Sequence, residues 1–123
     1  MKLLIVEDEV ALAKVLEEKF KKEKYEVKVA GDGMEALEAV PKFKPEIILL
    51  DLLLPKKGGL EVLEELKKSG DWKNIPVIVL SNLDDDQNIK KAMKLGAVDY
   101  FVKAQHPIKE VVEKVEAFVV KHG

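Results

Sequence analysis

Residues 47–54 read IILLDLLL, and this stretch decides the fold because it places one aspartate inside an apolar run. Ile47–Leu50 has no polar alternation, which is typical of a parallel strand covered on both faces. Asp51 follows at the carboxyl end of that strand. A lone carboxylate in such surroundings is costly unless it is paired or neutralised. We therefore expect Asp51 to end a buried strand with charged partners nearby.

Similar runs lie on both sides of this stretch. Leu3–Val6 and Val77–Leu80 are almost continuously apolar, Tyr25–Ala30 alternates as a half-covered edge strand would, and Tyr100–Val102 is a fifth short run. Segments with helical periodicity separate the five runs, most clearly over residues 108–119. Five strand–helix units in succession predict an α/β fold with a parallel sheet and right-handed crossovers.

The helices have recognisable faces and ends. Asp8 is a candidate cap for the first helix, Gly58-Gly59 opens the third, and Pro107 stands where the first turn of the last would begin. The apolar stripes of the first and third helices consist of Leu12, Val15, Leu16 and Phe20, and of Leu60, Leu63 and Leu66.

Composition narrows the class of protein. The 123 residues suffice for one domain, which we expect to span residues 1–123 and to leave no room for an output domain. All 21 basic residues are lysine, and the net charge is −2, so a nucleic-acid-binding role is not expected. There is no cysteine and no apolar stretch long enough to span a membrane, and because the first residues run straight into a predicted strand, we expect no signal peptide. We expect a cytoplasmic protein with no membrane partner.

Polar residues stand at the ends of four of the predicted strands. The end of the first strand carries Glu7 and Asp8, that of the third Asp51, that of the fourth Ser81 and that of the fifth Lys103. Carboxyl ends of parallel strands lie along one edge of a sheet, where open α/β folds carry their chemistry. Each residue also has a plain structural reading: Asp8 as a cap, Lys103 as a solvated strand end and Ser81 as a turn former.

The combination points to phosphoryl transfer at a metal. Three carboxylates in one pocket repel each other, and a divalent cation relieves this; an all-oxygen site suits Mg²⁺, which also holds phosphate. One carboxylate can then attack phosphorus and become an acyl phosphate. Lys103 would supply positive charge and Ser81 a hydroxyl donor. The chain has two serines and no threonine, so a hydroxyl at this strand end is not a product of abundance.

Four segments together resemble the receiver domains of two-component response regulators, of the stand-alone type typified by the chemotaxis regulator. They are LIVEDE at 4–9, ILLDLLLP at 48–55 followed by Gly58-Gly59, VIVLS at 77–81 and GAVDYFVK at 96–103. The resemblance runs end to end. It implies a doubly wound, flavodoxin-like (βα)5 three-layer sandwich with the parallel strands in the order 2-1-3-4-5. It also implies a phosphoacceptor signalling domain rather than an enzyme, one that assists its own phosphorylation and slow dephosphorylation.

The resemblance also assigns roles to individual residues. Asp51 is the implied phosphoacceptor, from a sensor histidine kinase, a phosphotransfer protein or a small phosphodonor. Mg²⁺ would be bound by Asp8 and Asp51 directly, by Glu7 through water and by the backbone carbonyl of Leu53. Ser81 is the implied switch hydroxyl, and Tyr100 the aromatic residue that turns inward with it; an ordinary half-buried strand tyrosine is the alternative. Lys103 completes the set.

Two features depart from the family pattern. Ala104 stands where the family usually has a proline after the lysine, joined by a cis peptide bond, and the sequence leaves the geometry of the Lys103–Ala104 bond open. Leu53 and Leu83 occupy positions at which faster-hydrolysing relatives tend to carry polar side chains. Two leucines beside a phosphoryl group would impede an attacking water, so we expect a long-lived phosphorylated state.

A downstream protein is expected to bind the face formed by the fourth helix, fifth strand and fifth helix, as is usual in the family. Lys90, Lys91 and Lys94 on the fourth helix could meet an acidic partner, or could simply be a solvated face.

Three other functions are weighed against this one. A flavodoxin-like cofactor binder would cradle phosphate after the first strand, where this chain has acids. A phosphatase with an aspartyl nucleophile would want a second acid at Leu53. An interaction domain that keeps the fold without using the switch stays open, since a designed or consensus sequence could carry the site residues passively.

Overall fold

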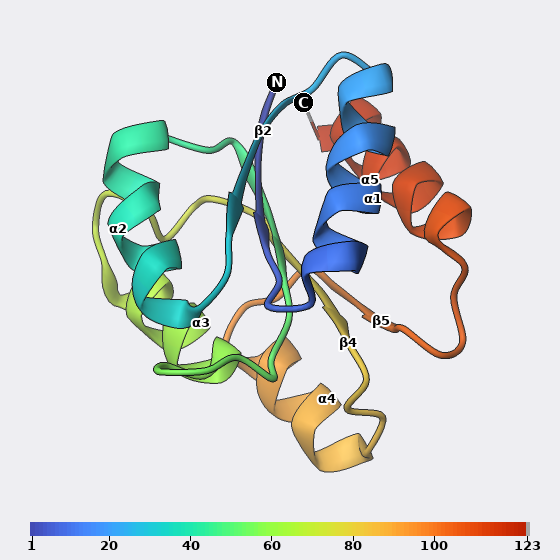
Figure 1. Ribbon diagram of the computed structural model, residues 1–123. Helices are drawn as coiled ribbons and strands as arrows, with labels where there is room; N and C mark the ends of the chain where they lie inside the picture. The colour runs from blue at the N-terminus through green and yellow to red at the C-terminus, as the bar shows by residue number, and fades with distance from the viewer. Residues whose placement is uncertain (123) are drawn as a thin grey trace.

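The structure, a computed structural model, describes residues 1–122 and alternates strands with helices along the chain (Figure 1). Gly123, the last residue of the predicted domain, lies outside the described residues. The elements are β1 (Lys2–Val6), α1 (Val10–Lys22), β2 (Glu26–Ala30), α2 (Gly33–Phe43), β3 (Ile47–Leu50), α3 (Gly59–Lys68), β4 (Val77–Ser81), α4 (Asp86–Lys94), β5 (Asp99–Val102) and α5 (Ile108–His122).

The strands form one parallel sheet in the order β2-β1-β3-β4-β5, which confirms the predicted topology. Val6, the last residue of β1, pairs with Ala30 on one side and with Leu50 on the other. Strands β1, β2 and β3 therefore end level with one another. As its alternating sequence predicted, β2 lies at an edge of the sheet.

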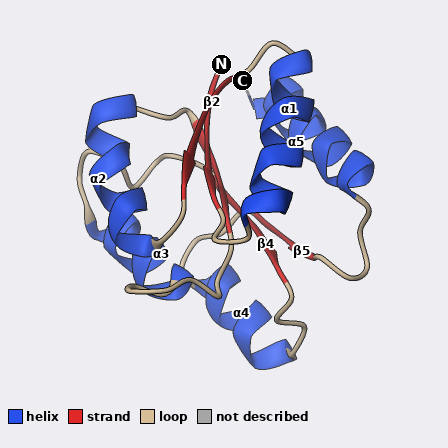
Figure 2. Ribbon diagram, viewed as in Figure 1, coloured by secondary structure: helices blue, strands red, loops and turns tan. Residues whose placement is uncertain are grey.

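Helices cover both faces of the sheet and make three layers (Figure 2). On one face, Leu4, Ile48 and Val79 pack with residues of α2, α3 and α4; on the other, Ile5, Leu49 and the apolar stripe of α5 pack together with α1. The strands β1, β3 and β4 are apolar throughout because neighbouring residues point into two different cores. None of the helices within residues 1–122 has the length and apolar character needed to cross a bilayer.

Element ends differ from the sequence predictions in a few places. Asp8 does not cap α1: Glu9 holds the N-cap position without a side-chain hydrogen bond, and the Asp8 carboxylate lies with other acids instead. Val15, predicted in the apolar stripe of α1, is 38% exposed, whereas Leu16 and Phe20 are fully buried. By contrast, Ser81 ends β4 as expected, because β4 continues to pair with β5 as far as Ser81 and Val102.

Candidate functional site

The acids of the candidate site lie where β1 and β3 end side by side. The backbone N–H of Asp51 donates to the carbonyl of Val6 over 3.0 Å, so the parallel pairing continues one residue beyond the strands. Glu7 and Asp51 are each only 3% exposed, whereas Asp8 is exposed. One carboxylate oxygen from each of these three acids lies within 4.8 Å of the other two. The sheet therefore brings together the acids predicted from the sequence.

Lys103 joins this group from the end of β5. Its ammonium lies 2.7 Å from Asp51 Oδ2 and 2.8 Å from Glu7 Oε1. The peptide bond to Ala104 is trans, since residues 1–122 contain no cis peptide bond. Alanine in place of the family's proline thus does not prevent the lysine from reaching the acids.

Backbone N–H groups also donate hydrogen bonds to the two buried carboxylates, Asp51 and Glu7. The N–H of Leu53 donates to Asp51 Oδ1 over 3.0 Å, and the N–H of Glu9 donates to Glu7 Oε2 over 3.1 Å. Each buried acid therefore has one ammonium and one amide as partners. Such partners offset the cost of burying a charge. The sequence predicted charged partners near Asp51 for this reason, because Asp51 lies within an apolar run.

The pKa values of Glu7 and Lys103 reflect both their burial and their contacts with neighbouring charges. Burial and the charge of Asp51 raise the pKa of Glu7, against the lowering effects of Lys103 and the Glu9 amide. Burial works to lower the pKa of Lys103, but its hydrogen bonds and charge contacts with Asp51 and Glu7 outweigh this and raise it. With Asp8 included, the site holds three acids and one lysine, an excess of negative charge that a cation can neutralise.

The donor set fits a hard divalent cation. All three acids offer oxygen, the ligand atom that Mg²⁺ prefers, and the exposed Asp8 leaves one side open to water and ligand. Both oxygens of Glu7 already accept hydrogen bonds within the protein. A direct bond from Asp8 and a water-mediated one from Glu7 are consistent with this arrangement.

Ser81 and Tyr100 meet at Leu83 in the loop after β4. Ser81 is fully buried, and its Oγ accepts a hydrogen bond from the Leu83 N–H over 3.4 Å. The half-buried Tyr100 hydroxyl donates to the Leu83 carbonyl over 2.6 Å. Burial, followed by the charges of Asp85 and Asp51, raises the pKa of Tyr100. Both side chains thus hold one residue of this loop.

Two contributors to the site were missed by the sequence prediction. Leu83 was considered only for its side chain, whereas its peptide groups contact both Ser81 and Tyr100. Gly59 was considered as a helix start and as part of a motif, but not for its contact with the site: a Cβ there would collide with the backbone of Asp51 and Leu52. The Gly58-Gly59 pair was the available signal, since such pairs also mark a close backbone approach.

The family model for the response regulator receiver domain matches residues 3–116, nearly the whole chain. Solved structures agree with this match. The chain is similar to the receiver domain of a Francisella response regulator named 1452, with 30% sequence identity, a TM-score of 0.88 and coverage of 99% of this chain and 98% of that one.

Two further solved structures are similar to this chain. The Mn(2+)-bound form of the response regulator Rcp1 has 30% identity and a TM-score of 0.87, with coverage of 99% of this chain and 96% of that one. The BeF3-activated N-terminal receiver domain of Klebsiella pneumoniae RstA has 29% identity and a TM-score of 0.85, with coverage of 95% and 97%.

Proposed function

The chain belongs to the response regulator receiver domain family, and on that premise we propose that it is a phosphorylation-dependent switch whose phosphoacceptor is Asp51. One observation carries the proposal: the buried Asp51 carboxylate lies 2.7 Å from the Lys103 ammonium and within 4.8 Å of carboxylate oxygens of Glu7 and Asp8. The phosphodonor is a sensor histidine kinase, a phosphotransfer protein or a small acyl phosphate. Residues 1–123 act as one receiver unit.

In the proposed transfer, an oxygen of Asp51 attacks the phosphorus of the donor. The bond from phosphorus to the donor's leaving atom breaks, the leaving group takes the electron pair, and Asp51 becomes an acyl phosphate. Lys103, which contacts Asp51 Oδ2, is placed to compensate the charge of the new phosphoryl oxygens. Asp51 needs no general base, since a carboxylate attacks in its ionised form.

We propose Mg²⁺ as the cofactor, held by Asp8 and Asp51, by Glu7 through water and by the backbone carbonyl of Leu53. Bound Mg²⁺ would offset the repulsion between the acids and the incoming phosphoryl group. The Mn(2+)-bound form of the similar regulator Rcp1 supports a divalent ion in this family. Asp8 supports it in this chain, because its exposed carboxylate lies at the open side of the cluster.

The switch would act through Leu83. A phosphoryl group on Asp51 offers a stronger acceptor to the Ser81 hydroxyl, and a shift of Ser81 would alter its bond to the Leu83 N–H. Tyr100, bound to the carbonyl of the same residue, would follow. The phosphorylated protein would then favour one of two packings of the β4–α4 loop, which is a population shift.

A downstream protein would read this change on the face made by α4, β5 and α5. Tyr100 lies on β5, and the exposed Lys90, Lys91 and Lys94 lie on α4 beside it. An acidic patch would be the complementary partner surface.

The experiment is incubation of the protein with acetyl phosphate and Mg²⁺, followed by intact mass measurement. The expected result is one added phosphate on the parent protein and none on Asp51→Asn. Asp71→Asn is the matched control, because Asp71 is an exposed aspartate outside the acid site, and it should be modified like the parent. Modification of Asp51→Asn, or none of the parent, would contradict the proposal.

We further propose that the phosphorylated state is long-lived. Leu53 is 51% exposed beside Asp51, where its apolar side chain would exclude an attacking water. Leu53→Asn should therefore shorten the half-life of the acyl phosphate, while Val120→Asn, at an exposed position on α5, should not. A half-life of seconds for the parent domain with Mg²⁺ would refute this expectation.

A further inference from the structure

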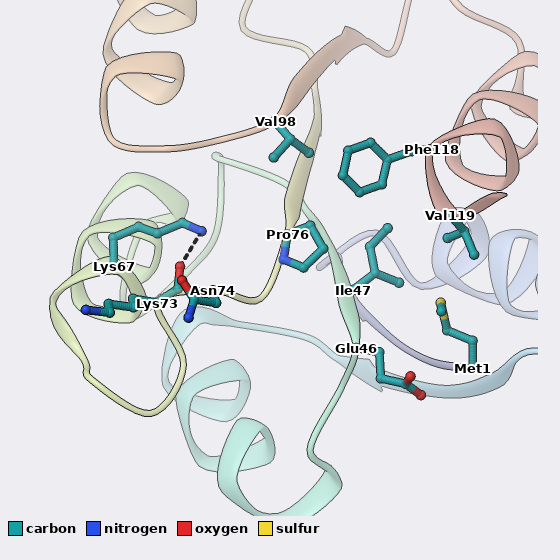
Figure 3. Close-up of a pocket in the computed structure, with 10 residues that line it drawn as sticks. All are labelled: Met1, Glu46, Ile47, Lys67, Lys73, Asn74, Pro76, Val98, Phe118 and Val119. Carbon is teal, nitrogen blue, oxygen red and sulfur yellow. Dashed lines mark hydrogen bonds between the residues drawn. The ribbon is translucent and has the colours of Figure 1, made fainter. Parts of the chain in front are cut away.

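A cavity of about 530 Å³ lies at the edge of the sheet where the strands begin (Figure 3), whereas Asp51 follows the end of β3. Its lining comes from the beginnings of strands rather than their ends: Ile47 starts β3, and Pro76 and Val98 directly precede β4 and β5. Phe118 and Val119 of α5 line the side facing Lys67 and Lys73 (Figure 3). Its volume falls in the range of about 300–1,000 Å³ that small-molecule sites occupy.

Four polar residues line this cavity, and three of them, Glu46, Lys73 and Asn74, are exposed. The half-buried one is Lys67, whose ammonium lies near the end of α3. It donates to the carbonyls of Lys73 and Ile75, each over 3.0 Å. Within residues 1–122, it forms no ion pair with a carboxylate, and burial without a countercharge lowers its pKa. An ammonium has three donors. Two protein acceptors therefore leave one donor and the whole positive charge for a ligand.

The position of this ammonium is built into the fold. The methylene stem of Lys67 packs against Gly96, where an added Cβ would lie 3.1 Å from Lys67 Cε. Gly96 has a φ of +111°, a conformation that favours glycine, and this keeps the space for the lysine stem. The two carbonyl acceptors then hold the charged end at the cavity wall.

The rest of the lining contains six apolar residues, with Lys73 and Asn74 on the same side as Lys67 and the acid Glu46 away from them. In Figure 3, Pro76 and Ile47 lie between Lys67 and the acid Glu46, and Phe118 lies on the far side of Pro76 from Lys67. Glu46 already accepts a hydrogen bond from the Lys2 N–H over 3.0 Å. A negatively charged group is therefore favoured at the Lys67 end and disfavoured at the Glu46 end.

We propose that this cavity binds a small amphipathic monocarboxylate, with its carboxylate on the Lys67 ammonium and its apolar body against Pro76, Val98 and Phe118. This inference goes beyond the phosphorylation switch and does not depend on it, since no residue of the acid site takes part. A carboxylate supplies the missing countercharge, and the apolar body covers surface that water otherwise contacts.

The test is an NMR titration of the isotope-labelled protein with octanoate. Amide shifts should be concentrated in residues 46–47, 73–75, 96–98 and 118–119, around the cavity, with a dissociation constant in the millimolar range typical of a small ligand. Acetate, which lacks the apolar body, and octanamide, which lacks the charge, should each bind much more weakly. Absence of a saturable shift with octanoate, or equal binding of octanamide, would overturn the proposal.

Variants make the test specific to Lys67. Lys67→Met keeps the stem and removes the charge, so octanoate binding should weaken at least about tenfold, the effect of losing one charge-assisted hydrogen bond. Lys68→Met is the matched control, because Lys68 is exposed and pairs only loosely with Glu64 at 3.9 Å; it should bind as the parent does.

A second variant covers the case in which Lys67→Met fails to fold. Val98 is 39% exposed at the cavity wall, so Val98→Glu should fold and place a repelling carboxylate there. Weaker binding of octanoate by this variant supports the proposed site. Undiminished binding would mean that octanoate binds elsewhere and would refute the proposal.

Discussion

Lys103 neutralises part of the same negative charge in the acid site that a bound metal ion would neutralise. Its ammonium contacts both buried carboxylates, at 2.7 Å from Asp51 and 2.8 Å from Glu7. In the metal-free protein this one lysine balances part of the charge of three acids. A cation entering the site therefore meets an attraction from the acids and a repulsion from Lys103.

We predict opposite effects of Lys103→Met on metal binding and on phosphorylation. Mg²⁺ affinity should rise about thirtyfold, because a unit charge ~4 Å from a divalent ion costs ~2 kcal/mol even in water. The rate of phosphorylation by acetyl phosphate should fall, because the charge compensating the phosphoryl oxygens is lost. Calorimetric Mg²⁺ titration and timed mass measurements check the two effects. Weaker Mg²⁺ binding would show that the lysine does not oppose the metal.

The raised pKa of Glu7 gives a pH dependence of stability with a definite sign. The folded protein keeps the Glu7 proton at pH values where the unfolded chain has released it. Stability contributed by this group therefore falls as pH rises from 4.5, its ordinary value, through the higher pKa of the folded state. Glu7→Gln, which carries no charge, should lack this loss.

Urea unfolding in the presence of a chelator measures the effect. The stability of Glu7→Gln relative to the parent should increase between pH 4.5 and about pH 7. The comparison across pH separates the charge from any hydrogen bond that glutamine fails to make. A constant difference between the two proteins would contradict a raised pKa.

At the scale of elements, the loop from β3 to α3 is held by a close backbone contact. Gly59 begins α3, and its N–H donates to the Leu52 carbonyl over 3.0 Å. The same contact leaves no room for a Cβ above Asp51 and Leu52. The start of this helix therefore fixes the position of the loop that follows Asp51.

We predict that Gly59→Ala destabilises the protein by about 1–3 kcal/mol, the usual cost of inserting an atom into a packed site. It should also slow phosphorylation, because the Asp51 backbone must move. Gly70 is the matched control, with nothing within 4 Å of an added Cβ, so Gly70→Ala should be neutral or slightly stabilising. Denaturant unfolding measures both. Equal stabilities would refute the close approach.

At the scale of the molecule, the sheet brings three mutually repelling acids, Glu7, Asp8 and Asp51, together at the carboxyl ends of its strands. Asp51→Ala removes one acid and leaves Glu7 paired with Lys103, so it should raise the melting temperature of the metal-free protein.

Mg²⁺ should stabilise the parent by about 1.4 kcal/mol at ten times its dissociation constant, and should have little effect on Asp51→Ala. Thermal unfolding with and without Mg²⁺ checks both. A lower melting temperature for metal-free Asp51→Ala would count against repulsion among the acids, and Asp71→Ala is the control.

Much of the fold could be predicted from local patterns. Runs such as Ile47–Leu50 lack alternation because both faces are buried, and the five runs predicted the strands to within about a residue at most ends. The sequence left two roles open for Asp8, a cap for the first helix and a member of the acid group, because local spacing alone cannot choose between them. Its carboxylate lies with Asp51, more than forty residues away in the chain, and not at α1.

The sequence by itself determined the parallel sheet and the set of polar groups at its carboxyl edge, because periodicity and strand ends are local properties of the chain. Only the tertiary structure decided how those groups pair. Lys103 bridges Asp51 and Glu7 through a trans peptide bond, and Ser81 and Tyr100 meet at Leu83. Lys67 likewise faces a cavity without a countercharge. Such pairings depend on the register between distant strands and on side-chain packing, which no local pattern specifies.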